Sequence, residues 1–427
     1  MNAHPDAEPG LSLLFHSPDA QPALLHTGLA SLEYGQPIGP DTTFNVGSVA
    51  KQITAHLTLL AARDSLLRLD QPAADLLPRL RISDISVADL ITHRSGLRDA
   101  ESLLALAGFR DLDHYTADDL RTLAYRQGQR AVPQSAFLYS NTNYLLLAEI
   151  LEAIHGTALA DLARHHLFEP LGMNDTHFKA DPRQVIPRAA SAYQATDHTW
   201  QHAQGPVTLP GPGSLWTTPR DLDRWLTQLH QSWQQPQLPW QGTLSYTPSD
   251  HPPYRYGPGL YARTRGDDAA VFHFGHEQGF SAAAHLESTG LRVICLSNNA
   301  DIPADHITSA VLQDHHTHPT RDPGQSLARA AKLRPAPSGM PPAQDTPSPH
   351  TDIGTFTCDQ APGSLRLTRA AGALHLWRRG TRDQLARSGP NTYTGNGYTL
   401  TLPGSTNAIS RFTLDLERAP GLHYLRQ

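Results

Sequence analysis

Residues 44–55 read FNVGSVAKQITA and carry the motif on which the interpretation of this chain depends. Ser48 and Lys51 are three positions apart at the predicted start of a helix, so both side chains lie on one helical face. A serine hydroxyl becomes a good nucleophile when a base removes its proton, and lysine does this when burial and neighbouring positive charge lower its pKa. The chain has only three lysines, Lys51, Lys179 and Lys332, against 31 arginines, so a lysine inside a motif is informative.

Two further elements follow along the chain. Tyr139 and Asn141, in FLYSNTNYLLLAEILE, lie in a loop that leads into an apolar helix and can present a phenol and a carboxamide to one pocket. His273 and Gly275 lie on a predicted strand, where a glycine would let substrate lie close to the backbone. The backbone N–H of the next residue, His276, could join the N–H of Ser48 as an oxyanion hole.

In this order, the three elements resemble the Ser-x-x-Lys, Tyr-x-Asn and His-x-Gly motifs of the serine β-lactamase and penicillin-binding-protein superfamily. Four further segments are similar to class C β-lactamase-like enzymes, and the resemblance covers about residues 9–316. These segments are LDQPAADLLP (69–78), DLITHRSGL (89–97), LFEPLGMNDTHF (167–178) and SLWTTPRDLDRWL (214–226).

The resemblance implies a role for each motif residue. Ser48 would form the acyl-enzyme, with Lys51 as general base and Tyr139 as the proton relay to the leaving group. Asn141 would contact the substrate and Lys51. Binding of the substrate is further expected to involve the last motif, that is His273, Gly275 and His276. No metal and no cofactor are implied.

His273 marks a departure from the β-lactamase pattern, because Lys-Thr stands there in true class C β-lactamases. A lysine helps to hold a substrate carboxylate, whereas histidine is only partly charged near neutral pH. His-x-Gly is typical of esterases and D-aminopeptidase-like peptidases, so we expect hydrolysis of an ester, an amide or a short peptide, including D-amino-acid peptides. A true β-lactamase or D,D-peptidase is one alternative, and a catalytically silent relative that uses the pocket for binding is another.

The expected fold is of the α/β (α+β) β-lactamase/transpeptidase-like class. Apolar strand-like runs near residues 11–35 and 256–298 flank a helix-rich middle, which predicts one antiparallel sheet built from both ends of a domain, with helices beside it and a helical subdomain. We predict this hydrolase domain over 1–318 and a Pro-rich linker over 319–349. Short alternating runs predict a small antiparallel β-barrel domain over 350–427, similar to the barrel attached to D-aminopeptidase-like proteins.

Composition narrows the expected partners. The formal net charge of −6 over 427 residues gives no electrostatic footprint for nucleic acid or for an anionic membrane, so a small molecule or short peptide is the expected partner. The sequence shows no signal-peptide pattern and no apolar span, which favours a cytoplasmic protein. Cys295 and Cys358 fall in different predicted domains and are expected to be free thiols. The oligomeric state is left open, a homo-oligomer included.

Overall fold

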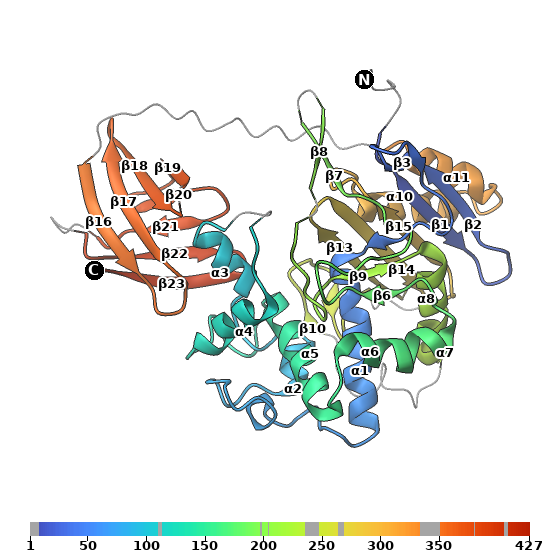
Figure 1. The fold of residues 1–427 in the computed structure, drawn as a ribbon, viewed down its shortest axis with the longest axis horizontal. Helices are drawn as coiled ribbons and strands as arrows, with labels where there is room; N and C mark the ends of the chain where they lie inside the picture. The colour runs from blue at the N-terminus through green and yellow to red at the C-terminus, as the bar shows by residue number, and fades with distance from the viewer. Residues whose placement is uncertain are drawn as a thin grey trace.

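The structure is a computed structural model that describes residues 8–109, 113–196, 199–203, 205–234, 247–263, 269–333, 351–379, 381–404 and 409–427. Figure 1 shows a β-barrel formed by the C-terminal strands beside a larger part in which helices surround a sheet. This arrangement confirms the predicted fold class, including the closed barrel at the C-terminal end.

The central sheet is antiparallel and combines the two ends of the first domain, as predicted. β1 pairs with β15, so that Leu11 lies opposite Ser297 and Leu13 opposite Cys295. The eight strands follow the order β10 (Thr247–Pro248), β11 (Arg255–Tyr256), β12 (Tyr261–Arg263), β13 (Ala270–Glu277), β14 (Phe280–Glu287), β15 (Arg292–Ser297), β1 (Leu11–His16) and β2 (Ala23–Thr27).

Helices cover both faces of this sheet, which explains why its strands read as continuous apolar runs. Leu11, Leu13 and Phe15 pack on the side of α10 and α11, whereas Leu14 belongs to the core shared with α1 and α8. The helices are α1 (Lys51–Arg63), α2 (Val87–Ile91), α3 (Ala100–Leu106), α4 (Ala117–Arg126), α5 (Asn141–His155), α6 (Leu159–Ala163), α7 (Glu169–Leu171), α8 (Pro219–Gln234), α10 (Ala304–Thr317) and α11 (Pro323–Ala330).

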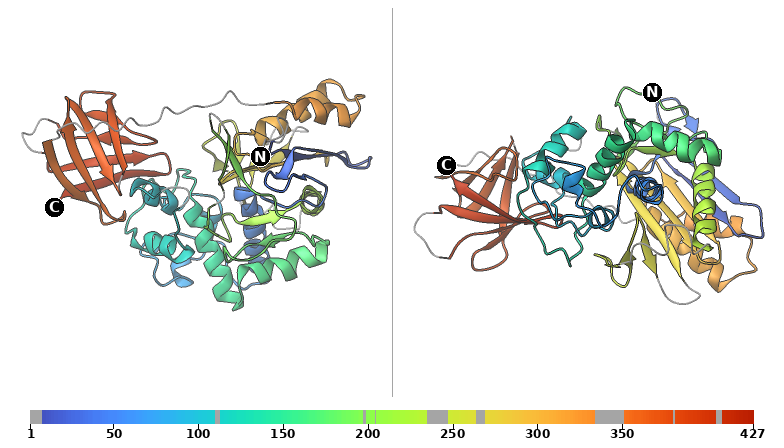
Figure 2. Two further views of the ribbon diagram at one scale, coloured as in Figure 1. Left: turned by 45° about the horizontal axis from the view of Figure 1, so that its top comes forward. Right: turned by 90° about the horizontal axis from the view of Figure 1, so that it is seen from below.

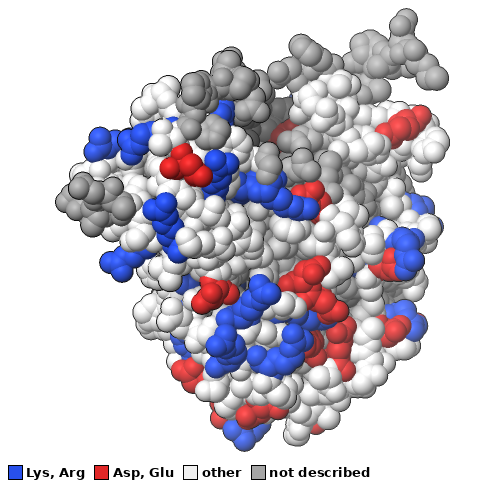
Figure 3. Space-filling view, turned by 60° about the vertical axis from the view of Figure 1, so that its left-hand side comes forward, with Lys and Arg blue, Asp and Glu red and all other residues white. Residues whose placement is uncertain are grey.

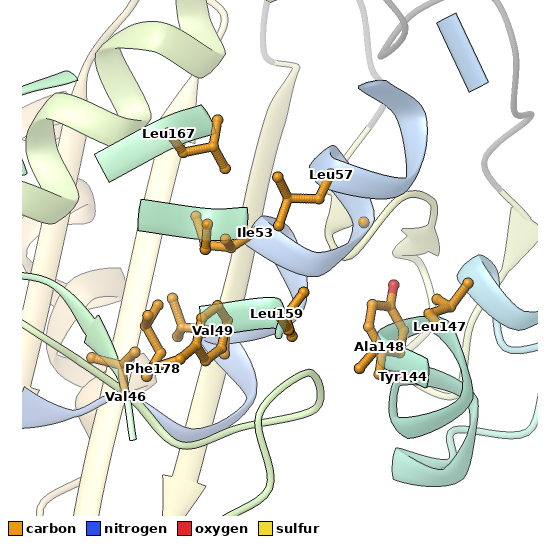
Figure 4. Packing of buried hydrophobic residues seen from close by; sticks show 14 of the residues in the cluster. Val46, Val49, Ile53, Leu57, Tyr144, Leu147, Ala148, Leu159, Leu167 and Phe178 are labelled. Carbon is orange, nitrogen blue, oxygen red and sulfur yellow. The ribbon is translucent and has the colours of Figure 1, made fainter. Parts of the chain in front are cut away.

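The helix α1 is the buried centre of the larger part. Val49, Ile53 and Leu57 form one apolar face, and Figure 4 shows them pointing toward Leu159, Leu167 and Phe178. Helical spacing therefore fixes the rotation of α1, and with it the direction in which Ser48 and Lys51 point. Smaller sheets complete this part: β3 (Leu29–Ser31) with β4 (Gln36–Pro37), β5 (Phe44–Asn45) with β9 (Leu215–Thr217) and β6 (His177–Phe178), and β7 (Tyr193–Ala195) with β8 (Trp200–His202).

The segment predicted as a linker over 319–349 begins with a helix instead. In α11 the Asp322 side chain accepts a hydrogen bond from the Gln325 N–H, and Pro323 occupies the first turn, where a missing N–H does no harm. Leu327 is fully buried against the sheet. Asp322 and Pro323, two residue types that favour a linker, therefore start a helix. The remainder of the predicted linker, 334–349, lies outside the described residues.

The C-terminal strands close into a barrel in which β16 pairs with β23. Its core continues into the larger part, because side chains of α3 and α4 belong to the same buried cluster as the barrel interior; Figure 2 shows the barrel beside these helices. The strands are β16 (Thr351–Thr357), β17 (Ser364–Ala370), β18 (Ala373–Arg378), β19 (Thr381–Arg387), β20 (Thr392–Thr394), β21 (Thr399–Thr401), β22 (Arg411–Leu416) and β23 (Ala419–Arg426).

Surface charge on the barrel side is mixed. Figure 3 shows Lys and Arg side chains lying among Asp and Glu side chains on this face. Cys295 is buried and Cys358 is partly buried, and both are free thiols. Within the described ranges, no helix combines the length and the apolar character needed to cross a membrane.

Candidate active site

Ser48 lies in a 3-10 turn, η1 (Gly47–Ala50), that runs directly into α1. The strand β13 crosses this turn at very short range. A Cβ atom at Gly275 would lie 2.0 Å from the Val46 carbonyl oxygen and 2.9 Å from the Ser48 nitrogen, so no larger residue fits there. The protein's own backbone, rather than the substrate that we predicted, occupies the space beside Gly275.

The same packing brings the backbone of His276 to the nucleophile turn. Gly47 has a φ of +48°, and a Cβ atom there would meet the His276 carbonyl oxygen at 2.8 Å and its nitrogen at 3.1 Å. The main chain of β13 therefore runs beside the turn that carries Ser48.

Lys51 is the buried partner of Ser48. Its Nζ donates hydrogen bonds to Ser48 Oγ at 2.8 Å and to the Pro212 carbonyl oxygen at 2.9 Å, and none of its surface is exposed. Burial, helped by the nearby Arg418 guanidinium, lowers the pKa of Lys51 to about 7, against the opposing effect of acidic neighbours. A substantial fraction of Lys51 is consequently a neutral amine at neutral pH.

Tyr139 is the third member of this cluster. Its hydroxyl is hydrogen-bonded to the Ser48 side chain, and burial raises its pKa above the usual value. The Lys51 Nζ lies 5.0 Å from the centroid of the Tyr139 ring, and the Arg418 guanidinium carbon lies 4.6 Å from it. Because the phenol keeps its proton and Lys51 loses its own more readily, the geometry favours Lys51 as base and Tyr139 as proton donor.

The His93 ring packs against the ring of Tyr139. Its ring centroid lies 4.4 Å from that of Tyr139, and its Nδ1 interacts with the Ser140 N–H at 3.3 Å and with Asn143 Nδ2 at 2.9 Å. Asn143 is fixed in turn by Ser95, whose hydroxyl donates to Asn143 Oδ1 at 2.6 Å. His93 is fully buried, and burial lowers its pKa well below the usual value, so it is a neutral packing residue.

Ser48 opens into a cavity of about 900 Å³ with an acidic lining. Asn141 contacts Glu101 here rather than Lys51. Its Nδ2 donates to Glu101 Oε2 at 2.6 Å, and its buried Oδ1 has no hydrogen-bond partner among the described residues. Glu277 lines the same cavity, where burial and the Glu101 carboxylate raise its pKa to about 8. Burial also raises the pKa of Glu101, whose other contact is the Tyr115 hydroxyl at 2.8 Å.

The structure brings Ser48, Lys51, Tyr139, Asn141 and the backbone at 275–276 together. The His273 ring lies beside Tyr139, with ring centroids 6.3 Å apart, and it does not reach the cavity. His273 Nε2 lies 3.3 Å from the Tyr256 hydroxyl, and its Nδ1 lies 2.6 Å from the Phe274 carbonyl oxygen. The residue is 1% exposed and is not part of the lining of the Ser48 cavity. Burial lowers its pKa to about 3, which keeps it neutral. A buried, neutral packing residue differs from the partly charged substrate contact that we predicted.

Three residues of the cavity were missed by the sequence analysis. Glu101 and Glu277 lie near motif residues in the structure, but a single acidic residue in a sequence gives no signal of its own. Arg418 comes from the turn between β22 and β23, more than 360 residues after Ser48, and no local pattern connects the two.

Comparisons with known proteins show which proteins this chain resembles. The family model described as Beta-lactamase matches residues 5–318. A D-aminopeptidase of Gluconobacter oxydans (strain 621H) is 27% identical over 335 residues, which cover 73% of this chain but only 62% of that protein.

Two solved structures extend the comparison to the fold. The D-amino acid amidase from Ochrobactrum anthropi SV3, solved with L-phenylalanine amide, has a TM-score of 0.59 at 25% identity and covers 68% of this chain and 86% of its own. The octameric penicillin-binding protein homologue from Pyrococcus abyssi has a TM-score of 0.63 at 17% identity and covers 98% of this chain and 96% of its own, so the barrel is part of a shared fold. With the family model matched across most of its length, this chain belongs to the beta-lactamase family.

Proposed function

We propose that this protein is a serine hydrolase that forms an acyl-enzyme on Ser48 and transfers the acyl group to water. The observation that carries the proposal is the 2.8 Å hydrogen bond from Lys51 Nζ to Ser48 Oγ, made by a fully buried lysine whose pKa is about 7. A lysine in this state accepts the serine proton at neutral pH, and an ordinary surface lysine does not.

Each proton has a path in the proposed reaction. Neutral Lys51 takes the Ser48 proton while Oγ attacks the substrate carbonyl, and the oxyanion is stabilised by the N–H groups of Ser48 and His276. Tyr139 donates its proton to the leaving nitrogen or oxygen as the carbonyl bond breaks, and Lys51 returns a proton to Tyr139. Water then attacks the acyl-enzyme and gives one proton to Lys51, which is neutral again. Lys51 passes this proton to Ser48 Oγ as the bond between Oγ and the acyl carbon breaks.

We infer further that the acyl group is an amino acid with a free ammonium, as in D-amino-acid amides and short peptides. Glu101 and Glu277 provide acidic groups beside Ser48, and the unpartnered Asn141 Oδ1 adds a hydrogen-bond acceptor. A substrate ammonium among these groups would relieve their mutual repulsion. The relatives named D-aminopeptidase and D-amino acid amidase support the D configuration.

Labelling with a fluorophosphonate probe, followed by peptide mapping, tests the nucleophile. We expect label on Ser48 in the folded protein and none in Ser48→Ala, together with turnover of D-alanine amide that the variant lacks. A folded wild-type protein that takes up no label on Ser48, or that hydrolyses no ester or amide, would contradict the proposal.

The ammonium site has a separate test. We expect D-alanine amide to exceed N-acetyl-D-alanine amide in kcat/KM by at least about tenfold, and Glu101→Gln to remove most of that ratio. Glu169→Gln is the matched control, because Glu169 is exposed and lies outside the cavity lining. An unchanged ratio in Glu101→Gln would exclude Glu101 as the ammonium partner.

A further inference from the structure

We propose that Arg418 of the barrel binds a carboxylate on the leaving group, so that the preferred substrates are short peptides with a free C-terminus rather than simple amides or esters. The inference rests on the proposed hydrolase function. It adds a specificity residue contributed by the C-terminal domain.

Arg418 reaches the active site from a tight turn. Leu416 at the end of β22 pairs directly with Ala419 at the start of β23, which leaves Glu417 and Arg418 as the two turn residues. Arg418 is exposed and lines the 900 Å³ cavity together with Ser48. A short turn between two paired strands presents its side chains with little backbone freedom.

The larger part of the protein holds this turn in position. The Asp99 N–H donates to the Arg418 carbonyl oxygen at 2.9 Å. The buried Arg98 donates to the carbonyl oxygens of Pro420 at 2.7 Å and Gly421 at 3.1 Å, and to Gln360 Oε1 at 2.7 Å. These contacts fix the backbone of the turn and leave the Arg418 side chain to the cavity.

Against the effect of burial, Tyr139 and the carboxylates of Asp99 and Glu417 lie near Arg418 and raise the pKa of its guanidinium. In the part of the chain that the structure describes, no carboxylate forms an ion pair with its guanidinium. Asp99 is the nearby candidate, but its carboxylate already accepts hydrogen bonds from the Ser102 N–H and the Asn141 N–H. Among the described residues that line the cavity, Arg418 is also the only lysine or arginine.

A guanidinium in this position suits a carboxylate. Its planar donors match the two oxygens of a carboxylate, and the contact is stronger in a partly enclosed cavity than on an open surface. The neutral, buried His273 supplies no positive charge to the cavity, so recognition of an anion falls to Arg418.

The position relative to Tyr139 assigns the carboxylate to the leaving group. Arg418 lies over the ring of Tyr139, and the Tyr139 hydroxyl is the proposed donor to the departing atom. Asn141 and Glu101 form the other group of polar contacts and are assigned to the acyl side. A peptide with an amine on the acyl residue and a carboxylate on the next residue satisfies both charged groups of the cavity.

The test compares D-alanyl-glycine with D-alanyl-glycinamide, which release amines that differ only in the terminal carboxylate. We expect wild-type kcat/KM to favour D-alanyl-glycine by at least about tenfold, mainly through KM. Arg418→Gln should bring the ratio near one, and Arg418→Lys, which keeps the charge but not the planar donors, should give an intermediate value. Arg411→Gln is the matched control, because Arg411 is an exposed arginine of the same hairpin outside the cavity.

D-Alanine amide separates this inference from the proposed function. If wild-type protein hydrolyses none of the three substrates, the proposed function fails. If it hydrolyses them but the ratio is near one, or stays at the wild-type value in a folded Arg418→Gln variant, Arg418 does not recognise a carboxylate and only braces Tyr139.

Discussion

Replacing Arg418 by Gln also tests the electrostatic environment of Lys51. Both cationic groups lie within 5.0 Å of the centroid of the Tyr139 ring, so they are at most about 10 Å apart. Repulsion between two unit charges at about 10 Å is about 1.7 kcal/mol at an effective dielectric of about 20, and about 0.4 kcal/mol at the value of about 80 for water. These energies correspond to shifts of about 1.2 and about 0.3 pH units.

The sign of the shift follows from the charges. Removing the guanidinium makes the Lys51 ammonium easier to keep, so the pKa of Lys51 rises from about 7. Because the neutral amine is the base, the rising limb of activity with pH should move upward by about 0.3 to 1.2 units. If the two charges lie closer than the upper limit of about 10 Å, the shift of the pH profile should be larger.

The assay is kcat/KM for 4-nitrophenyl acetate against pH at low ionic strength, where screening is weak. This substrate has no titratable group, so the limb reports on the free enzyme. Arg411→Gln should keep the wild-type profile. If the rising part of the kcat/KM profile stays at the same pH in Arg418→Gln, or moves to lower pH, then the base that it reports is not a Lys51 amine whose pKa is lowered by Arg418.

Three further predictions concern single residues, each with its own measurement. Tyr139→Phe should lower kcat by roughly 10²–10⁴-fold with little change in the melting temperature, because it removes the proton donor and keeps the ring; a decrease below threefold would exclude the relay. Gly275→Ala should lower the free energy of unfolding in urea by about 1–3 kcal/mol and reduce labelling of Ser48, because the added Cβ has no room. In the control Gly39→Ala, where nothing lies within 4 Å of the added Cβ, the free energy of unfolding should change by no more than about 0.5 kcal/mol. Equal effects of the two substitutions would contradict the packing argument. Arg98→Ala should lower the free energy of unfolding by about 3 kcal/mol or more in the same measurement, because three acceptors lose a charged donor. Replacing the exposed Arg366 by Ala should have little effect. A decrease below about 1 kcal/mol for Arg98→Ala would show that the turn does not depend on Arg98.

The sequence predicted what depends on local spacing. The three-residue interval places Ser48 and Lys51 on one helical face, where their side chains form a hydrogen bond, and the apolar runs of β1 and β15 pair as expected. The start of the predicted linker contains a helix that the composition did not indicate, because Asp322 and Pro323 start α11 with the same residue types that favour a linker.

What the sequence could not predict depends on approach between distant segments. At position 275 the close approach of the Val46 carbonyl oxygen leaves no room for a side chain. The sequence HFG cannot distinguish this reason for a glycine from close approach of a substrate. His273 is neutral because of its burial beside Tyr256, which depends on the order of the sheet, where only β12 separates β11 from β13. Arg418 reaches Ser48 only because the barrel rests on the segment before α3.

The turn at Glu417 and Arg418 has a consequence for how such an enzyme changes over time. Both residues are exposed and neither belongs to the barrel core, so the turn accepts replacement without loss of folding. In the proposed reaction, bond cleavage depends on Ser48 in η1 and on Lys51 at the start of the buried helix α1. Substrate preference can therefore diverge through mutations in one short turn while the reaction itself is inherited unchanged, and exchange of this turn between homologues is a direct route to altered selectivity.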